Sequence, residues 1–273
     1  MSAKVALVTG ASSGIGEATA LELTRRGFTV YGGARRVERM AGLRAQSLRT
    51  LALDITDDAS VTAAVAAIER EAGRLDVLVN NAGYGSYGAA EDVPLAEGRR
   101  QFEVNVFGVM RLTQLVIPVM RRQGAGRIIN VTSVGGKIYA PFGAWYHGSK
   151  FALEGMSDVL RIELKPFGID VVVIEPGLTK TEWLDIAAKH LVETSGRGAY
   201  ATAAQRHARS MLTGPQVARK SDPAVIARAI ATGATARKPK TRYAAGYSAR
   251  TVLTLRRLVS DRIFDRLVSR SMR

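Results

Sequence analysis

Short apolar runs alternate with longer amphipathic stretches along most of this chain. Runs of five or six mostly apolar residues, which are typical of buried strands, occupy residues 4–9, 28–33, 48–53, 75–79, 127–131, 170–174 and 241–245. Between them, apolar positions with helical spacing predict helices over residues 17–26, 58–72, 95–123, 142–167 and 223–232. This alternation predicts an α/β fold: one doubly wound, Rossmann-type parallel sheet with helices on both faces, in a single domain spanning 1–273.

The regular pattern loosens over residues 178–222. Trp183, Leu184, Ile186 and Leu191 predict one short amphipathic helix, and a stretch rich in Gly, Ser and Ala follows it. Long irregular insertions in compact domains are usually functional or disordered. We therefore predict that residues 178–222 form a mobile lid over the substrate.

Residues 246–273 are predicted to form a basic C-terminal helical extension, with one amphipathic helix over residues 249–272. Its apolar positions are Val252, Leu255, Leu258, Val259, Ile263, Phe264 and Leu267, and most of the other face is Arg256, Arg257, Arg262, Arg266 and Arg270. This helix could pack on the domain with its basic face in solvent, cap the substrate entrance, or lie on an anionic membrane. Asp261 and Asp265 interrupt the charge, so we predict at most weak, salt-sensitive membrane association.

Composition narrows the function classes. The net charge is +15, and residues 236–273 hold eleven basic and two acidic residues, hence nine of those fifteen charges. No nucleic-acid reader motif accompanies the charge, so no nucleic-acid partner is predicted. Cysteine is absent, which excludes disulfides and thiolate catalysis, and the three histidines lack metal-site spacing, so no metal site is predicted. We find no signal peptide and no apolar run near the roughly 18 residues that span a membrane, and we expect a cytoplasmic protein.

A glycine-rich turn, Gly10-Ala11-Ser12-Ser13-Gly14-Ile15-Gly16, connects the first predicted strand to the first predicted helix. Glycines let the backbone approach a pyrophosphate, and the helix N-terminus offers N–H donors. The spacing differs from the common G-x-G-x-x-G fingerprint. Its place between strand and helix nevertheless predicts a dinucleotide phosphate site.

Tyr146 and Lys150 lie four residues apart in a predicted helix, so both side chains leave one face about 6 Å apart at Cβ. A nearby ammonium can lower the pKa of a phenol, normally about 10, by roughly 1–3 units. Tyr146 could then exchange a proton with an alcohol or carbonyl oxygen. By itself, the spacing also fits a tyrosine and a lysine on a helix surface.

Polar residues recur where the predicted strands end, and such ends share one edge of a parallel sheet. In chain order the motifs are Thr9-Gly10-x-x-x-Gly14-Ile15-Gly16, Asn80-Asn81-Ala82-Gly83, Asn105, Ser133, Tyr146-x-x-x-Lys150 and Pro176-Gly177. Together they resemble the short-chain dehydrogenase/reductase family over residues 4 to about 181. Tyr84, the 132–136 loop and the basic tail are similar to its hydroxysteroid and retinol dehydrogenase-like branch.

The resemblance implies a role for each matching residue. Tyr146 would be the general acid/base, Lys150 would lower its pKa and hold the nicotinamide ribose, and Ser133 would bind the substrate oxygen. Asn105 would steady Lys150, while Asp54 and Asn81 would border the adenine. The remaining cofactor contacts would be Gly10, Ser12, Ser13, Gly14, Ile15, Gly16, Ala82, Gly83, Pro176, Gly177, Thr179 and Thr181. Pairing of copies through the helix of Tyr146 would make a homo-oligomer.

Cofactor choice is predicted from the end of the second strand. An acidic residue there would bind the ribose 2′-hydroxyl of NAD, but this chain has Ala34 followed by Arg35 and Arg36. Guanidinium groups suit a phosphate. We predict NADP(H), chiefly through Arg35, rather than NAD(H); the alternative is two solvated arginines at the start of a helix.

The predicted substrate is a lipophilic alcohol or ketone, steroid-, retinoid- or aliphatic-like. Six aromatic residues are candidates for the wall of its site, with Trp145 better explained as core: Tyr84, Tyr87, Tyr139, Phe142, Trp145 and Trp183. The competing hypothesis is a non-catalytic regulator that binds a dinucleotide. Such a protein would be expected to lose Tyr146 or Lys150, and this chain keeps both.

Overall fold

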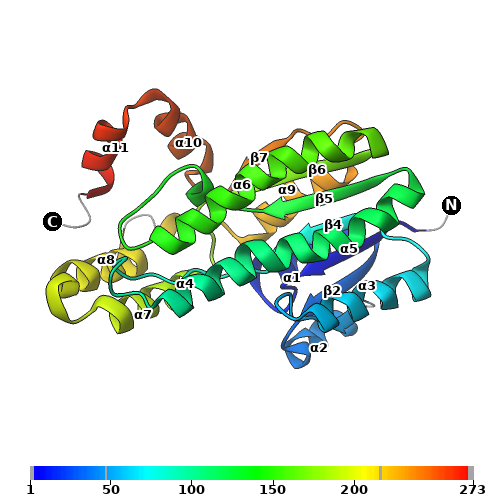
Figure 1. Ribbon diagram of the computed structural model, residues 1–273, viewed down its shortest axis with the longest axis horizontal. Helices are drawn as coiled ribbons and strands as arrows, with labels where there is room; N and C mark the ends of the chain where they lie inside the picture. Colours follow the sequence, from blue (N-terminus) through cyan, green and yellow to red (C-terminus); the bar gives the residue numbers. More distant parts are fainter. Residues whose placement is uncertain (1–2, 47, 215–216, 270–273) are drawn as a thin grey trace.

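We describe residues 3–46, 48–214 and 217–269 of a computed structural model. Within this part of the chain, seven parallel strands form one sheet in the order β3-β2-β1-β4-β5-β6-β7 (Figure 1). The strands are β1 (Val5–Thr9), β2 (Thr29–Ala34), β3 (Arg49–Ala52), β4 (Val77–Asn80), β5 (Gly126–Val131), β6 (Ile169–Pro176) and β7 (Arg242–Ala245). The predicted fold class is confirmed, and the strand order reverses between β1 and β4, where such sheets bind their ligands.

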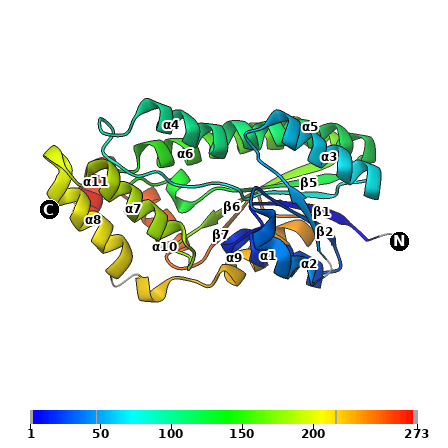
Figure 2. The same cartoon turned by 90° about the horizontal axis from the view of Figure 1, so that it is seen from below.

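Helices cover both faces of the sheet (Figure 2). One face carries α1 (Gly14–Arg25), α2 (Ala41–Arg44) and α9 (Pro223–Thr235), and the other carries α3 (Asp58–Ala72), α5 (Gly108–Gln123) and α6 (Ala144–Leu164). Successive residues of β1 point to opposite faces: Ala6 and Val8 enter the core beneath α1 and α9, whereas Val5 and Leu7 enter the core beneath α3, α5 and α6. Burial on both faces explains why the strands appear in the sequence as continuous apolar runs.

Helix ends follow the local chemistry of the sequence. Asp57, immediately before α3, accepts a hydrogen bond from the Ala59 N–H at 3.0 Å, and Asp222 caps α9 through the Ala224 N–H at 2.8 Å. Short 3₁₀ turns supplement the α-helices: η1 (Val37–Met40), η3 (Val134–Gly136), η4 (Lys165–Phe167), η5 (Gly198–Tyr200) and η6 (Val217–Arg219).

The predicted helix 95–123 is continuous but not uniform. It consists of α4 (Leu95–Phe102), a π-helical turn η2 (Glu103–Phe107) and α5, so its irregularity lies neither at Gly98, inside α4, nor at Pro118, inside α5. By length and composition alone, Leu95–Gln123 could cross a membrane, but 44% of that window is buried inside the protein. Its α5 portion packs against the sheet and contributes to the core of the domain.

A buried polar network lies beneath the strand ends. The Asn80 Nδ2 donates to Asn130 Oδ1 at 2.9 Å and to Thr113 Oγ1 at 3.1 Å, and the Asn130 Nδ2 donates to Ser157 Oγ at 2.8 Å. All four side chains are at most 2% exposed. The network therefore joins β4 and β5 to α5 and α6 inside the core.

The predicted lid is more ordered than its sequence indicates. After α7 (Trp183–Ser195), which was predicted, the Gly- and Ala-rich stretch forms a further helix, α8 (Ala201–Thr213), packed along α7. Ala204 and Ala208 are buried in this contact. The small alanine side chains therefore let α8 pack closely, where the sequence had indicated an irregular segment.

The predicted single C-terminal helix is wrong. The chain forms α10 (Ala249–Leu258) and α11 (Asp261–Val268), separated by extended backbone at Val259 and Ser260; positions 270–272 of the prediction lie outside the described residues. The break lets α11 turn back onto the loop before α6. There the Phe264 ring lies 5.2 Å from the Tyr139 ring, centroid to centroid, and the Tyr139 hydroxyl donates to Asp265 Oδ1 at 2.9 Å. The extension thus packs on the domain.

Candidate functional site

The glycine turn between β1 and α1 has the close approach that its sequence predicts. Gly10 and Gly14 have φ angles of +68° and +57°, a conformation that favours glycine. At Gly16, an added Cβ would lie 2.1 Å from the Gly10 carbonyl oxygen, which no larger residue could accommodate. Ser12, Ser13 and Ile15 complete this turn at the start of α1, so the cradle required by a pyrophosphate is present.

Asn81 holds the turn from the neighbouring strand. Its Nδ2 donates to the Thr9 carbonyl oxygen at 2.9 Å, while the Thr9 hydroxyl accepts from the N–H groups of Asn81 and Ala82, both at 3.0 Å. The predicted contact of Asn81 with adenine stays a prediction, because its amide nitrogen is already bonded to the turn. Gly83 follows, and a Cβ there would lie 3.0 Å from Asn105 Oδ1 and 3.6 Å from Lys150 Nζ.

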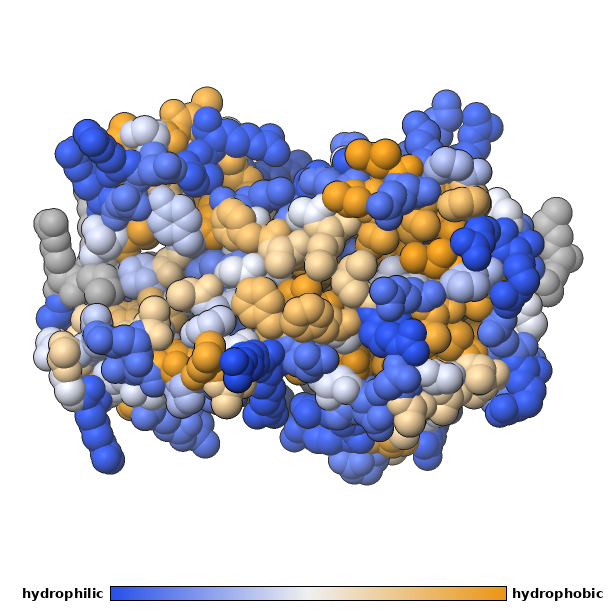
Figure 3. Space-filling view, viewed as in Figure 1, coloured by the Kyte–Doolittle hydropathy of each residue, from blue (hydrophilic) through white to orange (hydrophobic). Residues whose placement is uncertain are grey.

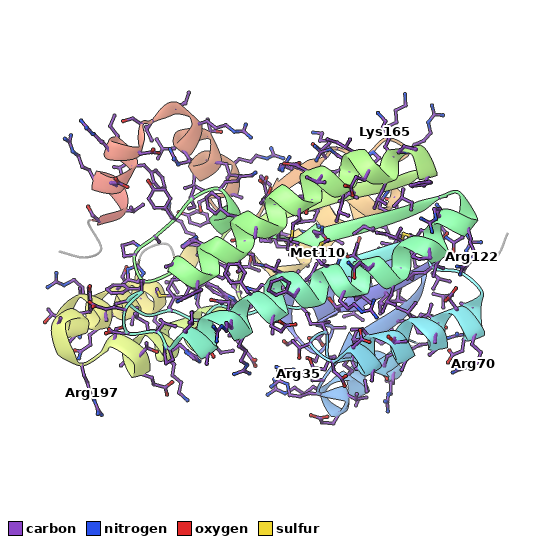
Figure 4. All side chains as sticks on the ribbon, in the orientation of Figure 1. Arg35, Arg70, Met110, Arg122, Lys165 and Arg197 are labelled. Atoms are coloured by element: carbon purple, nitrogen blue, oxygen red, sulfur yellow. The ribbon has the colours of Figure 1, made fainter. Side chains whose placement is uncertain are left out.

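Arg35 and Asp54 border the end of the site near β2 and β3. Arg35 is exposed directly after β2, beside α2 in Figure 4, and with Arg99, Arg100 and Thr56 it lines a cavity of about 290 Å³. Burial alone would raise the pKa of Asp54. Hydrogen bonds from Thr56 (its N–H at 3.0 Å, its hydroxyl at 2.8 Å) and the charges of Arg35 and Arg100 nevertheless hold that pKa below its ordinary value.

Part of the segment after β6 has a structural role, and part of it borders the glycine turn. A Cβ at Gly177 would lie 2.1 Å from the Tyr247 carbonyl oxygen, so the Pro176-Gly177 turn packs tightly against the chain after β7. Thr179 is buried and its hydroxyl donates to the Gly177 carbonyl at 3.0 Å, away from the glycine turn. Thr181 faces Gly14, whose added Cβ would meet its methyl group at 3.0 Å, and both line a cavity of about 800 Å³.

Tyr146, near the N-terminal end of α6, is only 7% exposed. Burial raises the pKa of its phenol to about 12, against the opposing effect of a side-chain hydrogen bond with Ser133. Lys150 is equally buried; burial lowers the pKa of its amine to about 8 although the Glu154 charge raises it, and Nζ donates to the Val131 carbonyl at 3.1 Å. In the protein by itself, desolvation thus dominates the pKa of the phenol, and its predicted lowering by Lys150 stays a prediction.

Asn105 is placed by the π-helical turn. Its Nδ2 donates to the Tyr84 carbonyl at 2.9 Å and to Ser149 Oγ at 3.0 Å, and its Oδ1 accepts from the Tyr84 N–H at 3.1 Å. It therefore fixes the loop after β4 to α6, one residue from Lys150. Sequence reasoning located Asn105 but missed the π turn, for which the local pattern carried no signal.

Three of the six candidate aromatic residues surround Tyr146. The rings of Trp183 and Tyr87 lie 4.9 and 5.8 Å from its ring, and Phe142 belongs to the same apolar cluster, together with Ala187 and Leu191 of α7. The other three lie elsewhere. Tyr139 docks α11, the Tyr84 hydroxyl donates to Glu97 at 2.9 Å, and Trp145 packs on Gly98 of α4, as its assignment to the core predicts.

His147 is a structural residue of the site that sequence reasoning missed. Its Nδ1 lies 2.9 Å from the Gly135 carbonyl oxygen, and its Nε2 accepts from the Ala140 N–H at 3.1 Å. This pairing requires a neutral imidazole that donates from Nδ1. The ring thus fixes the 135–140 loop against α6, and its place next to Tyr146 was the available signal.

Comparison with known proteins decides the family. The family described as short chain dehydrogenase matches residues 4–190. This chain belongs to the short-chain dehydrogenase family. The predicted resemblance is confirmed at that level: the chain is an oxidoreductase of a family that binds a nicotinamide dinucleotide. Among the residues that the structure describes, no group of three or more His, Asp or Glu side chains could hold a metal ion.

Relatives of this short-chain dehydrogenase include a 3-ketodihydrosphingosine reductase of Bacteroides thetaiotaomicron, 42% identical over 68% of this chain and 67% of the relative. A short-chain dehydrogenase from Streptomyces avermitilis has a similar structure, with a TM-score of 0.80 at 35% identity over 99% of this chain and 98% of the other. These comparisons do not extend to the hydroxysteroid and retinol branch, which stays a prediction.

Two further structures hold cofactors. A metagenomic short-chain oxidoreductase in complex with NADP has a TM-score of 0.70 at 27% identity, over 89% of this chain and 96% of its own. A 3-ketoacyl-(acyl-carrier-protein) reductase from Brucella melitensis complexed with NADH has a TM-score of 0.71 at 32% identity, over 85% and 90%. The family thus uses either dinucleotide, and the choice in this chain depends on its own residues.

The neutral His147 predicts a pH dependence of stability. Burial lowers its pKa below the ordinary 6.5, and burial does the same for His207 of α8. Because the folded state disfavours protonation, stability is greatest above about pH 6.5 and falls as the pH drops from there through the folded pKa. Urea unfolding at pH 7.5 and 5.5 should show this loss. His147→Gln and His207→Gln should each reduce it and the double variant most; equal losses in all four proteins would contradict the assignment.

Proposed function

We propose that this enzyme is an NADP(H)-dependent oxidoreductase that transfers a hydride between the nicotinamide and a lipophilic alcohol or ketone, with Tyr146 as general acid/base. The observation that carries the proposal is the placement of Tyr146: its ring is enclosed by apolar and aromatic side chains and lies against the turn that carries Ser133, where a Cβ added at Gly135 would meet the ring at 3.0 Å. A polar pair within an apolar wall suits a substrate with one reacting oxygen on a hydrocarbon body.

The chemistry divides between the cofactor and the chain. When bound, the nicotinamide supplies or accepts the hydride. With a pKa of about 12, Tyr146 is protonated near neutrality and can donate to the oxygen of a ketone, which Ser133 can bind from the same side. Lys150, beside Gly83, would hold the ribose and carry charge close to the phenol.

Substrate class rests on the cluster around Tyr146. Trp183, Ala187 and Leu191 bring α7 against the tyrosine, so the α7–α8 pair would act as the lid and supply apolar contacts. The reductase relative named for 3-ketodihydrosphingosine, which carries a ketone on a long hydrocarbon chain, supports a lipophilic substrate here. The steroid- or retinoid-like alternatives fit the same apolar wall.

The first prediction concerns the acid/base. Tyr146→Phe keeps the ring and removes the proton, so turnover should fall by roughly 10²–10⁴ while cofactor binding persists. Lys150→Ala should weaken both. The measurement is cofactor absorbance against steroid, retinoid and aliphatic ketones. Near-normal turnover in Tyr146→Phe would refute the mechanism, and a wild type inactive on the whole panel would favour the non-catalytic regulator.

Cofactor choice is the second element of the proposal. Arg35 follows Ala34, and Arg99 and Arg100 of α4 line the same cavity, so three guanidinium groups surround the place where a 2′-phosphate would lie. Glu103 also lines this cavity, but the arginines outnumber it. No acidic residue stands at the end of β2 to bind a 2′-hydroxyl.

Arg35→Ala should raise the KM for NADPH by about tenfold or more, because a charged hydrogen bond contributes roughly 1.5–3 kcal/mol. The KM for NADH should change little. Arg36→Ala is the matched control, since Arg36 is exposed but does not line the cavity. A wild type that prefers NADH would contradict the assignment of NADP(H).

We further propose a homo-oligomer formed through α6, which lies beside α5 (Figure 1). On α6, Phe151, Val159 and Ile162 are 43%, 54% and 71% exposed along one face. Figure 3 views the face that carries these two helices and shows apolar side chains gathered there. Exposed apolar patches of this kind often mark protein contacts.

Ile162→Asp should therefore shift the protein toward monomer in sedimentation velocity, with little change in thermal stability because the side chain is exposed. Val192→Asp, at an exposed position of α7, is the control and should leave the assembly intact. An Ile162→Asp protein that sediments like the wild type would contradict this interface.

Finally, we propose a cytoplasmic protein with at most weak membrane association. Leu258 and Ile263 are 78% and 47% exposed on the extension, among exposed arginines. Phe264, in contrast, is buried against Tyr139 and is not available to a membrane. Basic residues near an anionic surface contribute on the order of 1 kcal/mol each, and salt screens them. Co-sedimentation with phosphatidylserine vesicles should be weak, abolished by high salt and reduced by Arg262→Ala/Arg266→Ala. Tight binding that survives high salt would refute this.

A further inference from the structure

A buried carboxylate lies directly beneath the turn that carries Ser133. Glu154, two helical turns after Tyr146 on α6, is 1% exposed. Its Oε1 accepts from the Thr132 hydroxyl at 2.6 Å, and its Oε2 pairs with Lys137 Nζ at 3.1 Å. Thr132 immediately precedes Ser133, and Lys137 immediately follows η3, so one carboxylate holds both ends of the turn.

The carboxylate is itself fixed from the edge of the sheet. Arg242 of β7 donates from Nε to Glu154 Oε2 at 3.0 Å and from Nη2 to Asp158 Oδ2 at 2.7 Å. Glu175 of β6 lies 3.8 Å from the Arg242 Nε. Because Arg242 bonds two residues of α6 that lie four positions apart, it sets both the position and the rotation of this helix relative to the sheet.

The turn rests on α6 without spare room. An added Cβ at Gly136 would lie 2.9 Å from Glu154 Cγ and 3.0 Å from the Lys150 carbonyl oxygen. The Ser133 hydroxyl also accepts from the Gly135 N–H at 3.0 Å, so its place follows that of the turn. Any slip of the turn along α6 would move Ser133 relative to Tyr146.

We infer that Glu154 is a positioning residue: through Thr132 and Lys137 it holds the Ser133 hydroxyl in register with the Tyr146 phenol. The inference rests on the proposed function, because it assumes that these two groups bind the reacting oxygen. Fold stability alone gives little reason for the carboxylate, since an apolar residue of similar volume is often as stable as a buried ion pair. Orientation of reacting groups is sensitive to shifts of about 1 Å, which can cost on the order of 10²-fold in rate.

Asp158 provides the matched control. It lies on the same helix, bonds the same Arg242 and also pairs with Arg161, but within the described part of the chain its ion pairs do not reach the turn. Asp158→Asn therefore removes a carboxylate from the Arg242 cluster while leaving Thr132 and Lys137 bound. A purely structural role for the cluster would make Asp158→Asn and Glu154→Gln equivalent.

The experiment compares Glu154→Gln, Thr132→Val, Thr132→Ser and Asp158→Asn in steady-state reduction of a ketone that the wild type accepts. Glu154→Gln and Thr132→Val should lower kcat by roughly tenfold to a hundredfold, with the KM for the cofactor within about threefold of wild type. Thr132→Ser, which keeps the hydroxyl, and Asp158→Asn should stay within about threefold in kcat. Thr132→Val changes no charge and tests the idea even if Glu154→Gln folds poorly.

A double variant separates positioning from general stability. In a Ser133→Ala background, Glu154→Gln should have almost no further effect on kcat, because the group that it positions is gone. Additive losses, or equal losses in Asp158→Asn, would overturn the inference. A normal kcat in both Glu154→Gln and Thr132→Val, together with an inactive Tyr146→Phe, would also overturn the inference but would leave the proposed function intact. An active Tyr146→Phe would instead overturn the proposed function, and the inference with it.

Discussion

The pairing of Asn80 with Asn130 is the constraint on which the site depends. These residues are register partners on β4 and β5, and their amides bond to each other and to the hydroxyls of Thr113 and Ser157. A shift of either strand by one residue would place its amide on the wrong side of the sheet and leave buried polar groups unpaired, at a cost of roughly 1–3 kcal/mol each. The pair thus fixes where both strands end, and hence where Asn81 and Ser133 lie relative to α5 and α6.

Helix α6 carries or holds most of the residues of the proposed site. On successive turns it presents Tyr146, Lys150 and Glu154, while His147 holds the loop that begins at Gly135. The same helix therefore carries the proposed acid/base and holds the turn that it works with. This arrangement explains how a phenol can stay enclosed and still keep a defined partner: the enclosure and the partner are attached to one rigid element.

Much of this could be predicted from the sequence, because buried strands and tight turns leave local signals. The strand ends, the glycine turn and the Tyr146–Lys150 spacing follow from such signals. The features that could not be predicted depend on tertiary contacts between distant segments. Val259 and Ser260 interrupt a pattern that is helical on both sides, since Phe264 finds a partner in Tyr139 far back in the chain. Likewise, the pKa of Tyr146 depends on how completely α7 encloses it, and spacing along α6 contains no information about that.

The bond between Arg242 and Glu154 joins residues 88 positions apart, and β7 is the last strand of the sheet in chain order. During synthesis, the preceding strands can pair and α6 can form before Arg242 has left the ribosome. Domains tend to fold from the N-terminus as they emerge, at about 5–20 residues per second. Before β7 has been added, Glu154 and Asp158 lack Arg242 as a partner, and α6 lacks the bonds that fix it to this edge of the sheet. The final position of α6 therefore depends on the addition of β7 to the sheet.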